Sequence, residues 1–252
     1  MGKSSQKRLR IFAGPNGSGK SLLSKALKNP ADKRIIIGVF VNADEIEKSI
    51  AEKGFLELKT YKISAVTKEL QLYILESGMS PAKMKSDKIH TQFKIRSNRI
   101  LFSGKINSYL AADLASFIRH KLLNAGISFA FETVFSHPSK LEIMREAKEK
   151  GYRIYLYFIT TEDPQINIDR VKLRVQKGGH PVPEDLISKR YFKTMKLLIA
   201  AIKASYRSYL FDNSGEHYEL VAFFEPVNIV RITDYDKKIQ YWFMKYVYAA
   251  KG

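Results

Sequence analysis

Residues 14–21 read Gly14-Pro15-Asn16-Gly17-Ser18-Gly19-Lys20-Ser21, and they are the most informative stretch of the chain. It matches the phosphate-binding template G-x-x-x-x-G-K-[ST] at every fixed position. An apolar run, Leu9 to Ala13, precedes it, and apolar residues follow it at helical spacing. Strand, glycine loop and helix form the context that such a loop requires, so the sequence predicts a nucleotide-binding protein.

The template has a physical basis. Backbone N–H groups must turn inward around phosphate oxygens at a helix N-terminus, and glycines tolerate that path. We expect Lys20 to reach the β- and γ-phosphates of ATP and the Ser21 hydroxyl to coordinate Mg²⁺. The alternative is a glycine-rich turn that merely caps a helix.

Composition is typical of a soluble globular protein, with 45% hydrophobic and 27% charged residues among 252. We expect one domain over residues 1–252. The absence of cysteine excludes disulfides and thiolate chemistry, which suits a reducing compartment. The amino-terminal residues lack the apolar core of a secretion signal, and no segment has the length of a membrane span. We therefore expect a cytoplasmic protein.

The charge is strongly positive, with a formal net charge of +18. A polyanionic partner such as nucleic acid is one explanation, and a solvated surface is the other. The stretch from Lys83 to Lys105 is especially rich in positive charge, and Asp87 is its one acidic residue. Its cations are Lys83, Lys85, Lys88, Lys94, Arg96, Arg99 and Lys105.

The rest of the chain alternates between strand and helix patterns. We expect a parallel sheet with helices on both faces, and ligands beyond the carboxyl ends of its strands. The expected strands are 9–13, 35–41, 127–131, 153–160 and 210–211, with peripheral strands at 218–224 and 227–232 and a small hairpin from 93–96 and 100–102. The expected helices are 61–77, 106–124, one ending at 150, one opening at 164, and 183–206.

Two carboxylates are candidates for chemistry. Asp44 follows the second expected strand, where it would accept the proton of an acceptor hydroxyl, or would simply favour the start of a helix. Glu132 ends a buried-looking strand, where it would hold a metal-bound water or a substrate hydroxyl, or would only cap a turn.

Basic and turn residues supply further candidates. Arg170 and Arg174 are one helical turn apart, so both guanidinium groups can face phosphate oxygens, or both can face solvent. The Gly178-Gly179-His180 run would give a mobile cover its hinge, or serve as a plain turn between helices. Asp212 and Asn213 follow the last central strand and could rim a nucleotide base, although any tight turn uses such residues.

Several motifs together resemble the zeta toxin family of P-loop kinases. They are A-G-P-N-G-S-G-K-S at 13–21, N-A-D-E at 42–45, F-E-T-V-F-S-H-P at 131–138, R-V-x-x-R-V-x-x-G-G-H-x-V-P at 170–183 and F-D-N-S at 211–214. The resemblance extends over about 200 residues in consistent order. Its most specific parts are the arginine-glycine-histidine segment and the F-E-T strand.

The resemblance implies a P-loop kinase fold and transfer of the γ-phosphate of ATP, with Mg²⁺, to a hydroxyl of a small molecule. In well-known members the acceptor is a UDP-activated amino sugar, and a small antitoxin blocks the nucleotide site. By motif, Asp44 resembles the catalytic base, Glu132 a substrate-hydroxyl contact, and Arg170 and Arg174 lid arginines.

The sequence departs from the family in a basic insertion at about 55–105, in the region expected to shape the acceptor pocket. Two other functions therefore stay open. One is a nucleic-acid-associated ATPase or nucleic-acid end kinase, which the charge favours. The other is a nucleotide-gated binding protein without catalysis.

Overall fold

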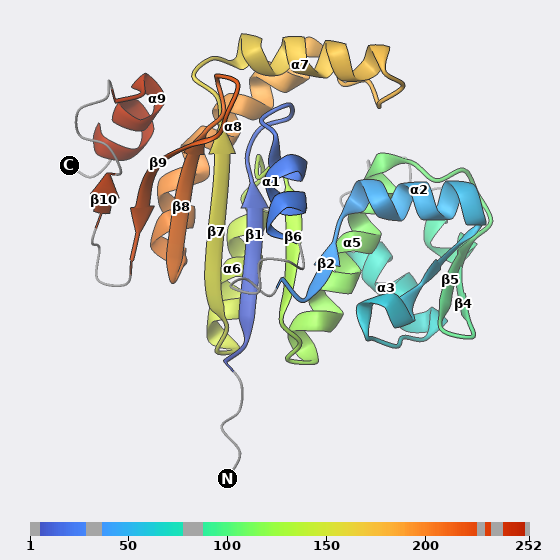
Figure 1. Cartoon of the computed structure of the whole chain (residues 1–252). Coiled ribbons are helices and arrows are strands. Elements are labelled where there is room, and N and C mark those ends of the chain that lie inside the picture. The colour runs from blue at the N-terminus through green and yellow to red at the C-terminus, as the bar shows by residue number, and fades with distance from the viewer. Residues whose placement is uncertain (1–5, 29–36, 78–87, 226–229, 233–238, 250–252) are drawn as a thin grey trace. The chain divides into compact units, whose positions relative to one another are not determined.

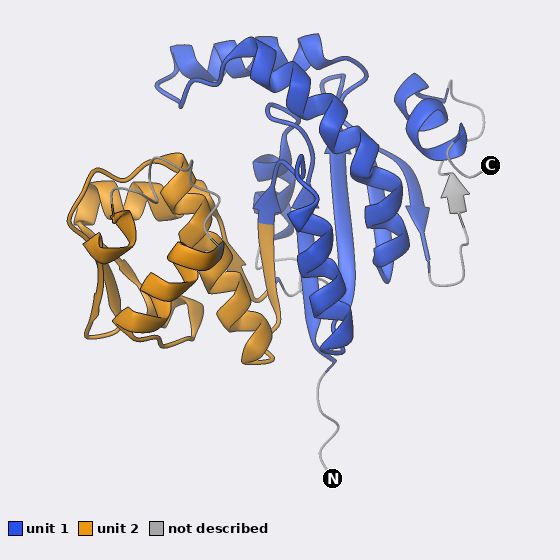
Figure 2. Cartoon of the chain, turned by 180° about the vertical axis from the view of Figure 1, so that it is seen from behind, with its two compact units in different colours: residues 1–37, 132–252 blue, residues 38–131 orange. Residues whose placement is uncertain are grey.

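The computed structural model describes residues 6–28, 37–77, 88–225, 230–232 and 239–249. The chain divides into two compact units: residues 1–37 with 132–252 form unit 1, and residues 38–131 form unit 2 (Figure 2). Strand β6 (Phe129–Thr133) begins in unit 2 and ends in unit 1. Each unit is described by itself.

Unit 1 is built on a mostly parallel sheet (Figure 1). Its strand order is β10-β9-β8-β7-β1. Strands β1, β7 and β8 are parallel, and β9 and β10 add on as antiparallel strands. The elements of unit 1 are β1 (Arg8–Ala13), α1 (Lys20–Leu27), α6 (Ser139–Glu149), β7 (Arg153–Thr160), α7 (Pro164–Gln176), α8 (Glu184–Ala204), β8 (Arg207–Asp212), β9 (Glu219–Phe224), β10 (Val230–Ile232), α9 (Tyr241–Phe243) and the π-helical turn η3 (Met244–Tyr248).

The two faces of this sheet differ in chemistry. Helices α6 and α8 cover one face (Figure 2). Strand β7 contributes the buried apolar side chains of Ile154, Leu156 and Phe158 to that face. On the other face, aromatic rings stack across β1, β7 and β8. Phe12 lies 4.9 Å from Tyr157, which lies 5.2 Å from Tyr209, between ring centroids. Such cross-strand pairs stabilise a sheet.

The predicted parallel α/β sheet is confirmed, and one of its central strands is longer than predicted. Strand β8 covers six residues, whereas only Leu210 and Phe211 were expected. The sequence pattern missed its first half because Arg207, Ser208 and Tyr209 alternate between faces without a run of aliphatic residues.

Unit 2 contains a second, smaller sheet. Its three strands have the order β3-β5-β4, and the predicted hairpin of β4 and β5 is confirmed as an antiparallel pair. Strand β2 pairs in parallel with β6. The elements of unit 2 are β2 (Val39–Val41), α2 (Ala43–Lys53), β3 (Phe55–Glu57), the 3-10 turn η1 (Leu58–Tyr61), α3 (Thr67–Ser77), the 3-10 turn η2 (Ile89–Gln92), β4 (Phe93–Arg96), β5 (Arg99–Phe102) and α5 (Ser108–Asn124).

The described parts of the segment at about 55–105 form helices and strands. Strand β3 pairs with β5 and thereby extends the β4–β5 hairpin to a three-stranded sheet. Strand β3 was not predicted, because three residues are too few to show a period. Parts of two predictions lie outside the described residues: the start of the 35–41 strand, and Lys83, Lys85 and Asp87 of the basic stretch.

The C-terminal part of unit 1 is attached to the end of β8 by a buried hydrogen bond. The Trp242 indole Nε1 donates to Asp212 Oδ2 over 2.7 Å, and both side chains are almost fully buried. Beside it, the Tyr241 backbone N–H donates to Glu162 Oε1 over 2.8 Å.

We expect Trp242→Phe to lower the free energy of unfolding by about 1–3 kcal/mol, because it leaves the buried Asp212 carboxylate oxygen without its donor. Urea denaturation measures the loss. Tyr241→Phe, which removes only a hydroxyl from a 64% exposed side chain, is the control and should change stability by less than about 0.5 kcal/mol. Equal stability of the two variants would contradict this role of Trp242.

Candidate active site around the phosphate loop

The loop between β1 and α1 has the backbone that a phosphate cradle requires. Gly14, Gly17 and Gly19 have φ of 150°, 75° and 95°. A Cβ on Gly14 would overlap the Ile159 carbonyl, and a Cβ on Gly17 the backbone of Asn167. These positions therefore need glycine both for conformation and for space.

Three side chains hold the loop by its carbonyl oxygens. Asn167 Nδ2 donates to Asn16 O over 2.5 Å, and Asn213 Nδ2 donates to Ser18 O over 2.9 Å. The Tyr218 hydroxyl donates to Gly19 O over 2.6 Å. The donors come from α7, from the end of β8 and from the residue before β9, so distant parts of unit 1 fix the loop.

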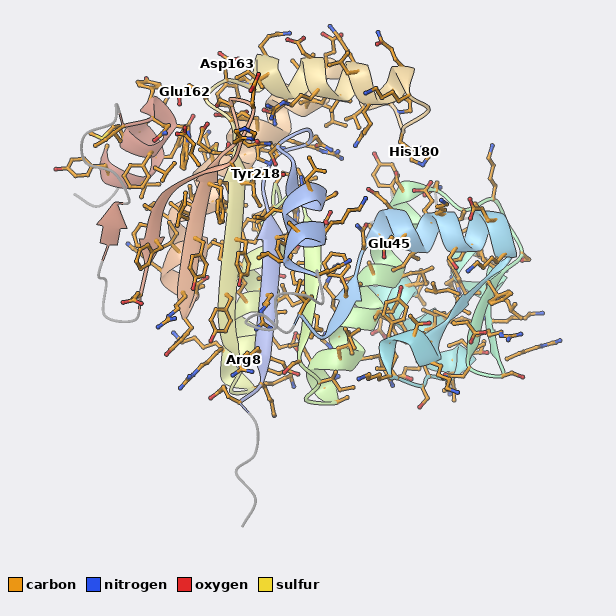
Figure 3. The ribbon with its side chains drawn as sticks, in the orientation of Figure 1. Arg8, Glu45, Glu162, Asp163, His180 and Tyr218 are labelled. Carbon is orange, nitrogen blue, oxygen red and sulfur yellow. The ribbon has the colours of Figure 1, made fainter. Side chains whose placement is uncertain are left out.

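Tyr218 and Asn167 were not predicted from the sequence. Tyr218 precedes β9 and lies near α1 (Figure 3). Burial raises the pKa of its hydroxyl, so the hydroxyl stays protonated and can donate at neutral pH. Asn167 is fully buried, and its Oδ1 accepts from the Thr161 hydroxyl. A neutral amide inside a helix carries no sequence signal for this contact.

The cationic and polar groups of the loop suit a polyphosphate. Lys20 begins α1, and its Nζ donates to Pro15 O over 2.7 Å, so the ammonium lies across the loop. The Ser18 hydroxyl is buried without a hydrogen-bond partner among the described residues. Together with the partial positive charge of the α1 N-terminus, these groups fit an anionic ligand.

Two candidate residues that are far apart in the sequence, Ser21 and Glu132, are in contact. Ser21 Oγ donates to Glu132 Oε2 over 2.9 Å, and Ser24 Oγ donates to Glu132 Oε1 over 2.5 Å. Ser24, which the sequence analysis missed, is 1% exposed and three residues beyond Ser21 on the same helix. Two hydroxyls of one helix thus hold both oxygens of the carboxylate.

This arrangement fits Mg²⁺, which prefers oxygen ligands and keeps several waters. The Ser21 hydroxyl and the Glu132 carboxylate are hard oxygen donors. In the described part of the chain, no three His, Cys, Asp or Glu side chains gather as a complete metal site. The ion would therefore be held largely by ligand phosphates and water.

Both candidate arginines lie on α7. Arg170 donates through Nη1 to Asn213 O over 2.5 Å and through Nη2 to Gly215 O over 3.1 Å. Arg174 is exposed and donates to His180 O over 2.8 Å. His180 is exposed at the far end of the following turn (Figure 3). Both guanidinium groups are bonded to backbone carbonyls, which an anion can replace.

Asp212 and Asn213 were expected to lie at the rim of a nucleotide base, and in the structure they make hydrogen bonds within the protein. Asp212 is 6% exposed, and its oxygens accept from Trp242 Nε1 and from the Ser214 N–H. Asn213 is 7% exposed and holds the phosphate loop. Buried amide and carboxylate groups need hydrogen-bond partners, and these contacts supply them. Asn213 therefore supports the phosphate loop directly, and Asp212 supports the segment that carries Asn213.

Asp44 lies in unit 2, in the first turn of α2. The cap of that helix is Asn42, whose Oδ1 accepts from the Asp44 N–H over 2.9 Å. The Asp44 carboxylate is exposed and is not needed as the cap, and the same is true of Glu45 next to it (Figure 3). Its role as catalytic base stays a prediction.

A family model described as Zeta toxin matches residues 59–217, more than half of the chain. Among curated proteins, an uncharacterized protein of Haemophilus influenzae is 36% identical over 72 residues, which are 29% of this chain and 51% of that protein. The chain thus spans about half the length of this curated relative.

Solved structures of similar fold include two of AvrRxo1-ORF1 with AvrRxo1-ORF2. The one with sulphate ions has a TM-score of 0.55 and 18% identity, and covers 92% of this chain and 62% of that chain. The one with ATP has a TM-score of 0.54 and 18% identity, and covers 91% of this chain and 61% of that one. At this identity, the likeness shows the fold, and this chain spans about three fifths of theirs.

We expect Gly19→Ala to abolish nucleotide binding, because the new Cβ would overlap the Asn213 amide and displace the loop. Isothermal titration with ATP and Mg²⁺ measures the loss. The matched control is Gly54→Ala. Gly54 also has a positive φ, of 77°, but its Cβ would meet no atom within 4 Å. That variant should cost about 1–2 kcal/mol of stability and leave ATP affinity unchanged. Unaltered ATP binding by Gly19→Ala would contradict the assigned cradle.

Proposed function

Because the chain belongs to the zeta toxin family, and is thus a P-loop kinase, we propose that it transfers the γ-phosphate of ATP, with Mg²⁺, to a hydroxyl of a small molecule. The observation that carries the proposal is the glycine cradle with Lys20 across it and Ser21 bonded to Glu132. An AvrRxo1-ORF1 structure with ATP supports the choice of nucleotide.

Phosphoryl transfer depends mainly on positioning and on stabilising charge. Lys20 would exchange its bond to Pro15 for the β- and γ-phosphates. Ser21 and Glu132 would hold Mg²⁺, directly or through water, and the ion would neutralise charge between those phosphates. We assign Glu132 to Mg²⁺ because it accepts from Ser21, the predicted metal ligand, whereas the family resemblance implies a substrate-hydroxyl contact for this residue.

The remaining roles concern the acceptor and the transferred group. Asp44 would accept the proton of the attacking hydroxyl. Arg170 and Arg174 would turn from the backbone carbonyls to phosphate oxygens, for which bidentate guanidinium contacts are well suited. We keep the UDP-activated amino sugar as the first acceptor to test.

We also propose a small antitoxin as a protein partner. The proposal rests on the family, and the AvrRxo1-ORF1 structures contain a second protein, AvrRxo1-ORF2. No helix in the described ranges has both the length and the apolar character needed to cross a membrane. Cytoplasmic location stays a prediction.

We expect Lys20→Ala to lower ATP affinity by more than tenfold and to abolish phosphate transfer. The control is Lys25→Ala, which removes an exposed cation from the last turn of α1 and should leave both unchanged. Titration with ATP and transfer of radiolabelled phosphate to a UDP-activated amino sugar or a cell metabolite extract are the measurements. The absence of any labelled acceptor with the unaltered protein would refute the kinase function.

We expect Asp44→Asn to keep ATP binding within about twofold while transfer falls at least about 10²-fold, the usual range for loss of general-base catalysis. Glu45→Gln is the matched control, since both acids lie in the first turn of α2 and favour its dipole equally. The same assays apply. Equal transfer rates for the two variants would exclude Asp44 as the base.

A further inference from the structure

The amino ends of the strands in unit 1 carry a basic surface that the proposed kinase site does not use. We term it the basic foot, and its cations are Lys7, Arg8, Lys150, Arg153 and Arg207. The sheet register brings them together. Arg8 lies opposite Arg153, and Tyr155 lies between Arg10 and Arg207 on neighbouring strands. Figure 3 shows Arg8 at the end of the sheet away from Tyr218 and the phosphate loop.

Tyrosines lie between these cations. The Arg153 guanidinium is 4.6 Å from the centre of the Tyr206 ring, and that of Arg10 is 5.4 Å from the centre of the Tyr155 ring. Lys7 Nζ is 5.7 Å from the centre of the Tyr152 ring. Each of these three cations therefore lies within cation–π distance of a tyrosine ring, and the exposed Arg153 lies over the partly exposed Tyr206 ring.

Positive charge on this surface exceeds negative charge. Glu225 pairs with Arg207 over 3.3 Å, and Glu146 pairs with Lys150 over 3.9 Å. Arg10 beneath this surface is buried and bonds to Tyr157, whereas Arg153 forms no ion pair with any residue that the structure describes. Arg153 is exposed, and Tyr155 and Tyr206 are partly exposed, so a ligand can reach guanidinium and ring together.

We infer that the basic foot binds single-stranded nucleic acid. Phosphate groups would contact the arginines, and bases would stack on the Tyr206 ring and the Arg153 plane. Nucleic acid is the polyanion that presents regularly spaced charges together with flat aromatic bases, and proteins bind single strands with this combination of residues. The +18 net charge of the chain favours such a partner.

The site is separate from the kinase chemistry. Along β1, Arg8 of the basic foot is six positions before Gly14 of the phosphate loop, which at about 3.3 Å per residue is about 20 Å. Binding at the foot therefore leaves the loop accessible, and the inference does not depend on the proposed function.

The test is fluorescence anisotropy with a labelled single-stranded oligonucleotide of about 12 nucleotides, within the usual site size. We expect Arg8→Gln/Arg153→Gln to weaken binding at least tenfold. We also expect the slope of log affinity against log salt concentration to fall by about 1.4, or about 0.7 per lost contact. The matched control is Lys193→Gln/Lys196→Gln, which removes the same charge from exposed positions of α8. Equal losses in the two double variants, or no binding by the unaltered protein, would overturn the inference.

A second arm separates nucleic acid from other anions. Tyr206→Leu should weaken oligonucleotide binding but leave binding of inorganic polyphosphate, which has no bases, unchanged. The inference fails if Tyr206→Leu has no effect on the oligonucleotide, or if phosphatidylserine vesicles bind the foot and the oligonucleotide does not.

ATP titration and thermal unfolding check that each variant is folded. If the double variant does not fold, the single variant Arg153→Lys is used in its place, because lysine keeps the positive charge but has no planar guanidinium group on which a base can stack. Arg153→Lys should then weaken oligonucleotide binding more than polyphosphate binding, and equal effects would contradict base stacking.

Discussion

The shape of the phosphate loop is the constraint on which the rest of unit 1 depends. Gly14, Gly17 and Gly19 have positive φ angles that other residues rarely adopt, and such a path needs support from its surroundings. The support comes from Asn167, Asn213 and Tyr218, which donate to three loop carbonyls. The sheet brings these residues together from positions about 150 to 200 residues along the chain.

The same supports connect the loop to the parts expected to move or to bind. Asn167 lies on α7 together with Arg170, one turn away, so the helix that carries the arginines is fixed to the loop at its first turns. Arg170 in turn bonds the carbonyl of Asn213, whose side chain holds the loop. Asp212, the preceding residue, is held by Trp242. These contacts therefore form one connected set of hydrogen bonds around the phosphate loop.

Charge is distributed between the two ends of the parallel strands. At the carboxyl ends, Lys20 and the α1 N-terminus provide the positive field expected of a phosphate site. At the amino ends, the basic foot carries a second positive field without a helix N-terminus or a glycine cradle. The two ends thus suit different anions: a compact polyphosphate at one, and an extended polymer at the other.

The glycine loop, the parallel α/β class and the family could be predicted from the sequence, because Gly14 to Ser21 and the later motifs are local patterns whose residues act within a few positions of one another. Glu132 could be named as a candidate, and its role in the site stays a prediction. The contacts of Glu132 with Ser21 and Ser24, and of Asn213 and Tyr218 with the loop, became apparent in the folded chain. Likewise, only the strand register gathers Arg8, Arg153 and their neighbours into one surface. These contacts join residues far apart in the chain, and a hydrogen bond or a charge cluster depends on distance in space, which a local pattern does not contain.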